Sequence, residues 1–473
     1  TEIPENAFSG AYSLTSIKIP GTVEKIGNNA FKGCTKLKDV YIEDLDKWYS
    51  YDFSNIDTNP MQYAENLYLN GELLRVVSIS DDNDKITANT FGNCKSIEKF
   101  EIGENNKNYA IGKYGELCDK NGTVLVFPYA ARTLRIENGF DFSRLRYMTS
   151  LESVSISSDV EDIPDGAFKN CVSLREITVD ENNESFRSVD GVLYSKTMRR
   201  LYAYPAKPGT EFAVPEKVVR FSPYAFANNK YLEKFEIPDS VTILDEYLFY
   251  NSRALKEISL CGKIRSIGDY SFAECTVLEK INWDANQITS LSSTVFNNAG
   301  TESEGVTVVF GDDVTTVPGG IFSSNNANVK NVYVGAGISC FGSNAFCECK
   351  TVEKVYITDV EKWLRTSFSN SNSNPLVYAK ELYLNGEKLD GIKLENAGSV
   401  QINLYAFYRF DGISFLDIKA NSISINGNAF WNCVNLKSVN LVADNSISVS
   451  YKAFDECIAL ESAVLTAGSR LDV

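Results

Sequence analysis

An Ala-Phe pair returns at a nearly constant interval along this 473-residue chain, and that interval limits the folds open to it. Phe8 and Phe31 are 23 residues apart, and Phe430 and Phe454 are 24 apart. The copies share the pattern A-F-x-x-C-x-x-L-x-x-I-x-I, which stands almost intact at residues 30–42. A unit of this length cannot bury its apolar face alone, so neighbouring units must stack. The chain is therefore expected to form a repeat solenoid.

Each copy contains one short strand. In the segment that ends at Ile42, apolar residues alternate, so Val40 and Ile42 should point inward while Tyr41 and Glu43 point outward. Pro20 directly follows the preceding strand and should end its pairing, because proline lacks an amide hydrogen. A period in the low twenties with L-x-x-I-x-I is the signature of leucine-rich repeats. The predicted fold is a right-handed β/α superhelix, mostly β with short helical turns, with one long parallel sheet and irregular insertions.

The same motif resembles that of the BspA-like leucine-rich-repeat proteins, which are built on the irregular treponemal class of repeat. The resemblance covers nearly the whole chain. It implies a secreted or cell-surface protein, mostly bacterial, that adheres to host matrix proteins or to other cells. The family carries no known catalytic residues, so the resemblance transfers none.

Two segments break the period and match each other in sequence. Each contains a tryptophan, Trp48 or Trp363, and later an Asn-Gly pair. We expect enlarged coils at about residues 43–90 and 358–405, each with a helix near the tryptophan and a strand that ends in the Asn-Gly turn. Each coil is either a protruding binding loop or a larger coil whose tryptophan packs a small core of its own.

Hairpin-like strands are expected in two further insertions, at about residues 103–140 and 180–222. The second contains Asp190-Gly191, and the first contains the run that ends at Pro128. No segment rich in Gly, Pro and Ser separates one part of the chain from another. The sequence therefore predicts a single continuous leucine-rich-repeat domain over residues 1–473.

Composition excludes several classes of function. The formal charge is −16 and the lysines are scattered, which opposes binding to nucleic acid or to an anionic membrane. The chain has no histidine, the commonest general base and metal ligand. No apolar run is long enough to span a membrane. We therefore expect no catalytic residues, no metal site and no cofactor. A glycosidase-like carboxylate pair is a weak alternative, since no spacing singles one out.

Seven of the eleven cysteines occupy one repeat position. They are Cys34, Cys94, Cys171, Cys275, Cys349, Cys433 and Cys457. A small buried thiol suits a crowded inner position, and most of these cysteines have no cysteine in the next coil. Free thiols are therefore favoured over disulfides, although an exported protein could form them.

Outward strand positions hold tyrosine at both ends of the array. Tyr41 and Tyr68 should stack in one row, and Tyr333, Tyr356 and Tyr383 in another, because adjacent strands lie about 4.8 Å apart. Tyrosine provides a large contact area and a hydroxyl at low entropic cost, which suits a ligand surface. It is also simply a good strand residue, so both interpretations stay open.

These features favour an extracellular or cell-surface binding module for a protein or glycan partner, on host matrix or another cell. The alternative is a non-catalytic spacer that presents another domain away from the cell. The chain opens in mid-repeat, so a signal peptide and an anchor are expected outside it.

Overall fold

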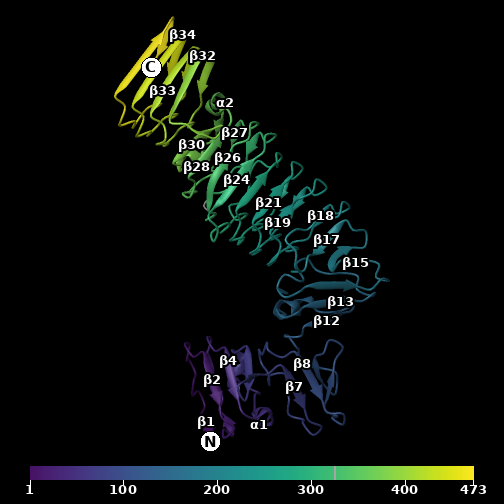
Figure 1. Ribbon diagram of the computed structural model, residues 1–473. Coiled ribbons are helices and arrows are strands. Elements are labelled where there is room, and N and C mark those ends of the chain that lie inside the picture. Colours follow the sequence, from purple (N-terminus) through teal and green to yellow (C-terminus); the bar gives the residue numbers. More distant parts are fainter. Residues whose placement is uncertain (324–325) are drawn as a thin grey trace. The chain divides into compact units, whose positions relative to one another are not determined.

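The computed structural model describes residues 1–323 and 326–473, and the chain divides into two compact units, Thr1–Leu193 and Tyr194–Val473. Each unit is a stack of coils in which a strand of one coil pairs in parallel with a strand of the next (Figure 1). The expected leucine-rich-repeat solenoid, mostly β with short helical turns, is confirmed. The expectation of one continuous domain over residues 1–473 stays a prediction.

The first unit contains short strands and one α-helix. Its strands are β1 (Glu2–Ile3), β2 (Ser16–Ile19), β3 (Lys25–Ile26), β4 (Asp39–Ile42), β5 (Asn66–Leu69), β6 (Glu72–Leu73), β7 (Val76–Ile79), β8 (Lys99–Ile102), β9 (Tyr109–Ile111), β10 (Leu117–Asp119), β11 (Val124–Val126), β12 (Thr133–Ile136), β13 (Ser153–Ile156), β14 (Glu176–Val179) and β15 (Phe186–Val189). Its helices are α1 (Leu45–Ser50) and the 3-10 helices η1 (Ile56–Thr58), η2 (Pro60–Gln62) and η3 (Phe142–Tyr147).

Strand β16 (Val192–Ser195) contains the boundary between the units. The second unit continues with β17 (Arg200–Ala203), β18 (Arg220–Phe221), β19 (Lys234–Glu236), β20 (Ile243–Leu244), β21 (Glu257–Leu260), β22 (Ser266–Ile267), β23 (Lys280–Trp283), β24 (Val306–Phe310), β25 (Thr316–Val317), β26 (Val329–Tyr333), β27 (Cys340–Phe341), β28 (Lys354–Ile357), β29 (Ser367–Phe368), β30 (Glu381–Leu384), β31 (Glu387–Lys388), β32 (Gly391–Ile402), β33 (Phe415–Ile425), β34 (Ser438–Val449), β35 (Ser462–Ala467) and β36 (Arg470–Asp472). Its helices are α2 (Val360–Arg365), η4 (Ser371–Ser373) and η5 (Pro375–Val377).

The parallel sheet is divided into segments, which corrects the expectation of one long sheet. In the second unit, eight strands pair in the order β19-β21-β23-β24-β26-β28-β30-β31. The last of them is antiparallel, because the Asn385-Gly386 turn folds β31 back onto β30. In the first unit, the antiparallel strands β9, β10 and β11 come between β8 and β12 in the chain, within one of the predicted insertions. Inserted hairpins therefore interrupt the parallel stacking.

The core of each coil repeats one pattern of burial. Val40 and Ile42 are buried, as the alternation predicts, and Tyr41 is only half-buried. The phenylalanines of the Ala-Phe pairs form a ladder through the core. Neighbouring rings of Phe249 and Phe272 lie 5.5 Å apart at 11°. Burial of such rings is the main source of stability in a repeat array, because each coil packs only on its neighbours.

The repeated cysteines are buried free thiols, as expected. In several coils the thiol donates a hydrogen bond to the carbonyl of the ladder phenylalanine in the preceding coil. Cys275 Sγ lies 3.2 Å from Phe249 O, and Cys433 Sγ lies 3.1 Å from Phe407 O. Burial raises the pKa of Cys275 to about 12. These thiols therefore satisfy buried carbonyl groups and are poor nucleophiles.

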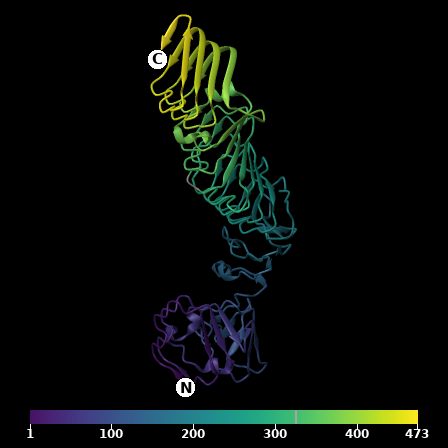
Figure 2. The same cartoon turned by 60° about the vertical axis from the view of Figure 1, so that its left-hand side comes forward.

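Strands β32, β33 and β34 are much longer than the others and lie side by side (Figure 2). In earlier coils a short strand such as β19 ends after a few residues, and a separate short strand such as β20 comes later. In the coils of β32 and β33, a register shift between Leu394 and Ala397 lets the two strands stay paired along their whole length. A β-bulge thus allows one continuous strand where other coils have two short ones.

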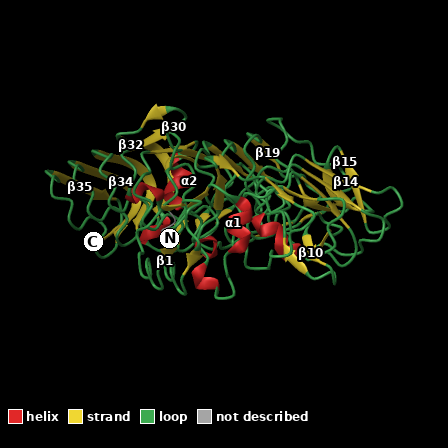
Figure 3. Cartoon of the chain, turned by 90° about the horizontal axis from the view of Figure 1, so that it is seen from below, coloured by secondary structure: helices red, strands yellow, loops and turns green. Residues whose placement is uncertain are grey.

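Helices are few and short beside the strands (Figure 3). The helix expected near each tryptophan is confirmed: α1 and α2 have six residues each. Across residues 1–323 and 326–473, no helix is both long enough and apolar enough to cross a membrane.

Candidate functional site

The candidate site in the second unit is a row of three tyrosines, Tyr333, Tyr356 and Tyr383, which we call the second strand-face row. They occupy paired positions on β26, β28 and β30. The ring centroids of Tyr333 and Tyr356 are 4.1 Å apart at 2°, and those of Tyr356 and Tyr383 are 4.9 Å apart at 19°. Tyr333 lies at one end of the row and is its most exposed residue, with 40% of its surface exposed. The structure therefore brings all three predicted residues together.

The first strand-face row consists of Tyr41 and Tyr68 in the first unit. The two residues are paired across β4 and β5, and their ring centroids lie 4.5 Å apart at 16°. The residue of β2 that pairs with Tyr41 is Lys18, so no third ring extends the row on that side. Lys18 instead forms an ion pair of 2.9 Å with Glu43.

Charged side chains fix one end of the second strand-face row. The hydroxyl of Tyr383 donates to Glu381 Oε2 at 2.9 Å, and Lys388 Nζ lies 2.7 Å from Glu381 Oε1. The pKa of the Glu381 carboxyl is lowered by its hydrogen bonds with Lys388 and Tyr383. Burial and the neighbouring phenols raise the pKa of Tyr356 to about 12. The row is therefore uncharged at neutral pH.

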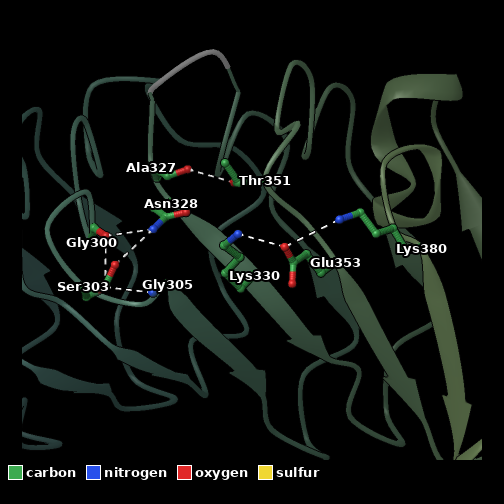
Figure 4. A network of polar contacts seen from close by, with 9 residues as sticks. All are labelled: Gly300, Ser303, Gly305, Ala327, Asn328, Lys330, Thr351, Glu353 and Lys380. Atoms are coloured by element: carbon green, nitrogen blue, oxygen red, sulfur yellow. Dashed lines mark hydrogen bonds and ion pairs between the residues drawn. The ribbon is translucent and has the colours of Figure 1, made fainter.

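A ladder of alternating lysine and glutamate runs beside the row, from coil to coil. Glu353 lies between Lys330 and Lys380, with ion pairs of 2.9 and 3.7 Å (Figure 4). Figure 4 also shows the neighbouring loop, which Ser303 and Asn328 hold through hydrogen bonds to Gly300. Such exposed pairs contribute little to stability. They neutralise the charge around the tyrosines.

The strand face also has an open hollow of about 650 Å³, lined by residues that include Glu211, Lys234, Glu236 and Glu257. The pKa of Glu257 is lowered, first by the hydrogen bond from Asn282 and also by Lys280. A general acid needs a raised pKa, so Glu257 is poorly suited to protonate a leaving group. In the described part of the chain, no cluster of three or more His, Cys, Asp or Glu side chains could hold a metal ion.

A second kind of tyrosine row lies at the turns and was not predicted from the sequence. Tyr224, Tyr247 and Tyr270 each come two residues before a ladder phenylalanine, and we call them the turn-edge row. The ring centroids of Tyr224 and Tyr247 are 4.7 Å apart at 6°, and those of Tyr247 and Tyr270 are 5.0 Å apart at 11°. Sequence periodicity does point to this row, since all three residues share one coil position.

The backbone at each of these tyrosines is left-handed, with φ of 61°, 57° and 58°. That conformation suits glycine and asparagine, and a bulky residue there costs about 1–3 kcal/mol. Stacking returns part of this cost, since an aromatic pair contributes roughly 0.5–1.5 kcal/mol. Strand propensity thus explains the strand-face rows but not the turn-edge row.

Solved structures of bacterial leucine-rich-repeat proteins are similar to this chain at low identity. A leucine-rich cell-surface protein from Faecalibacterium prausnitzii is 22% identical, with a TM-score of 0.36, and the match covers 78% of this chain and 86% of that one. The pneumococcal vaccine antigen PcpA is 18% identical, with a TM-score of 0.37 and coverage of 81% and 84%. A leucine-rich repeat protein from Eubacterium ventriosum is 17% identical, with a TM-score of 0.30 and coverage of 95% and 82%. No curated protein matches the chain.

The family match covers most of the sequence. The BspA type leucine rich repeat region, in six copies, matches residues 1–114, 140–189, 200–328, 302–377 and 400–470. It includes most coils of the phenylalanine ladder, the first strand-face row, and Tyr333 and Tyr356 of the second, whereas Tyr383 lies outside the matched ranges. The chain therefore belongs to the BspA-type leucine-rich-repeat family.

Proposed function

We propose that this chain is the binding region of an extracellular or cell-surface bacterial protein, and that it recognises a protein or glycan partner without catalysis. The observation that carries the proposal is the second strand-face row. Three stacked rings on β26, β28 and β30 present a large, uncharged contact area whose outermost ring is substantially exposed. Tyrosine surfaces of this kind are enriched at the centres of interfaces.

The surroundings of the row support a contact surface. Glu381 and Glu353 are each paired with lysines, so the ring surface is bordered by charges that are already neutralised. A partner can therefore cover the rings without leaving an unpaired charge buried, which would otherwise be costly. The rigid sheet beneath fixes the rings before binding, and this lowers the entropic cost of association.

The absence of catalysis is supported by chemistry. The chain contains no histidine, so the usual activators of Ser and Cys nucleophiles are missing. The pKa of each of Glu257, Glu353 and Glu381 is lowered by hydrogen bonds, with lysine or asparagine as the main donor, which favours the charged form. These carboxylates suit pairing rather than proton donation.

A binding array tests the proposal. The purified chain is applied to immobilised matrix proteins and to a glycan panel, together with the double variant Tyr356→Ala/Tyr383→Ala. The matched control is Tyr12→Ala/Tyr451→Ala, which removes two tyrosines that are 64% and 81% exposed and lie outside the rows.

We expect the row variant to lose binding by about tenfold or more, and the control to bind as the parent does. Circular dichroism verifies that both variants are folded. Unchanged binding by the row variant would reject the site. The spacer alternative predicts that no target binds in a manner that depends on these tyrosines.

A further inference from the structure

The left-handed backbone at the turn-edge tyrosines costs more free energy than the fold requires. At the same coil position, two residues before the ladder phenylalanine, other coils hold asparagine in the same left-handed conformation. These residues are Asn6, Asn29, Asn344 and Asn428, with φ between 54° and 57°. Asparagine and glycine adopt this conformation readily, whereas tyrosine does not. The coils could therefore close without tyrosine, and three successive coils keep it nonetheless.

Three successive coils give the row a defined geometry. Ile243 pairs with Ser266 across β20 and β22, just before Tyr247 and Tyr270. Phe226 N donates to Leu248 O at 3.0 Å, which places the coil of Tyr224 next to that of Tyr247. The ring of Tyr250 meets Tyr247 edge-on, with centroids 5.6 Å apart at 73°. The row is therefore a half-buried aromatic strip held by the backbone of three coils.

Two adjacent coils of this strip each carry a carboxylate at the same position beside the ring. Glu246 directly precedes Tyr247, and Asp269 directly precedes Tyr270; both are exposed. Asp269 accepts a hydrogen bond from Thr294 Oγ1 at 3.1 Å. In the part of the chain that the structure describes, neither carboxylate forms an ion pair. Two like charges thus stand on adjacent coils beside the rings without a cation, an arrangement that a cationic partner would relieve.

The two carboxylates are close enough to influence the phenol of Tyr247. The pKa of Tyr247 is raised, chiefly by burial and then by Tyr270, Glu246 and Asp269. The neighbouring coil shows how an arginine fits this edge. Arg220 Nε lies 3.0 Å from Asp245 Oδ2, and its Nη2 lies 3.4 Å from Oδ1. Asp245 is the residue before Glu246. A guanidinium therefore already occupies the carboxylate next to the proposed site.

We propose that the turn-edge row is a docking surface for an arginine-bearing segment of a partner protein. A guanidinium is flat, so it packs against an aromatic ring while it donates two hydrogen bonds to a carboxylate. The row offers both elements in register: Tyr247 and Tyr270 supply the rings, and Glu246 and Asp269 supply the charge. This site is separate from the second strand-face row, so it adds a surface to the proposed function and does not depend on it.

A second aromatic cluster provides the contrast that makes the proposal specific. Tyr405 holds the same coil position as the turn-edge tyrosines, also with a left-handed backbone. Its neighbour Tyr408 stacks on Trp431, with centroids 4.9 Å apart at 16°. The charged residue beside this cluster is Arg409, whose positive charge lowers the pKa of Tyr408 against the raising effect of burial. Aromatic rings beside an arginine should not attract arginine.

The test uses a fluorescent hexapeptide of alternating Gly and Arg, with a Gly-Lys hexapeptide as its counterpart, in fluorescence anisotropy titrations of the full chain at physiological ionic strength. One variant is Tyr247→Asn/Tyr270→Asn, which installs the residue that other coils carry there and therefore preserves the fold. Another is Glu246→Gln/Asp269→Asn. The matched control is Tyr405→Asn, the same substitution at the same coil position.

We expect the Gly-Arg peptide to bind the parent chain more tightly than the Gly-Lys peptide does. Each row variant should weaken it by about tenfold, and the Tyr405→Asn control should change it by less than about twofold. Thermal melting should leave Tyr247→Asn/Tyr270→Asn as stable as the parent chain or more stable. That result separates lost binding from lost fold.

Other outcomes overturn the proposal. Equal binding by the Gly-Lys peptide, or full binding by the tyrosine variant with loss only in the carboxylate variant, would mean that net charge alone attracts the peptide. Equal loss in the Tyr405→Asn control would mean that the aromatic edge binds without regard to its charge. Tyrosine-dependent binding of a neutral glycan, with none of the Gly-Arg peptide, would assign the surface to another class of ligand.

Discussion

The two tryptophan-containing coils, one in each unit, share a scaffold and differ in the surface that they carry. Trp48 Nε1 donates to Thr90 O at 3.0 Å, and Trp363 Nε1 donates to Ala406 O at 3.1 Å. Both tryptophans lie in a helix capped by an aspartate, Asp44 or Asp359. Because each indole N–H donates to a corresponding buried carbonyl of the following coil, the tryptophans are structural. This supports the interpretation of a larger coil with a small core of its own.

The difference lies on the strands that precede these coils. In the second unit, Tyr333 stacks on Tyr356 and lengthens the row to three rings. In the first unit, Lys18 stands where Tyr333 would and pairs with Glu43. One scaffold therefore carries a long aromatic row in one unit and a short row that ends at a lysine in the other. What varies between them is the exposed face of the strands.

The largest effect should come from the shared tryptophans. Trp48→Ala and Trp363→Ala each remove a ring that is at most 2% exposed, which should cost about 3–5 kcal/mol of unfolding free energy in its own unit. Urea denaturation monitored by circular dichroism measures both losses. Losses that differ by more than about 2 kcal/mol would mean that the two coils are not equivalent scaffolds.

The next largest loss of unfolding free energy should come from the buried asparagines of the same coils. Asn59 Nδ2 and Asn374 Nδ2 each donate to two backbone carbonyls of the following coil, and each side-chain oxygen accepts an N–H at 2.8 Å. Replacement by alanine leaves these buried groups unpaired, so about 2–3 kcal/mol should be lost in each unit. The same denaturation experiment reports it. An effect in only one unit would break the equivalence at this contact.

Separate substitutions at Lys18 and Tyr333, which hold corresponding positions in the two units, sharpen the comparison. Tyr333→Lys shortens the second strand-face row to the length of the first, and should weaken partner binding by about five- to tenfold, since one stacked ring contributes roughly 1 kcal/mol. Surface plasmon resonance with the partner found on the array measures it. Lys18→Tyr is the counterpart in the first unit and should leave this binding unchanged. A loss caused by Lys18→Tyr would place the site elsewhere.

The smallest effect concerns pH. The pKa of Tyr356 in the folded chain is raised from 10.0 to about 12, so the folded state holds this proton more tightly than the unfolded state does. The associated stability is therefore fully present below pH 10 and is lost as the pH rises through about 12. Difference absorbance near 295 nm, compared between the parent chain and Tyr356→Phe, should show a phenol that titrates late. A difference curve centred near pH 10 would contradict the packed row.

Much of this architecture can be predicted from spacing alone. The interval between Phe8 and Phe31 predicts the stacked coils, and the repeated outward tyrosines predict ring stacking of the kind seen at Tyr356. Such features depend on the repeat period and on strand alternation, both of which are visible in a single sequence. The binding role of the rows stays a prediction, because neither spacing nor stacking identifies a partner.

The remaining features depend on local balances that the period does not reveal. Strands β32 and β33 stay paired over their whole length through a bulge near Ala397. The turn-edge row was missed because propensity argues against a tyrosine such as Tyr247 in a left-handed conformation. In that row, stacking on neighbouring coils offsets part of an unfavourable local preference, so it emerges only when the coils are assembled.

The central claim is that the second strand-face row contacts the partner. Fluorine NMR of the chain labelled with 3-fluorotyrosine tests it most directly, with the resonances of Tyr333, Tyr356 and Tyr383 assigned through single Tyr→Phe variants. On addition of the partner, these three resonances should shift or broaden, while those of Tyr12 and Tyr451 stay in place. If the three stay in place while the partner is bound, the strand-face row is not the binding surface.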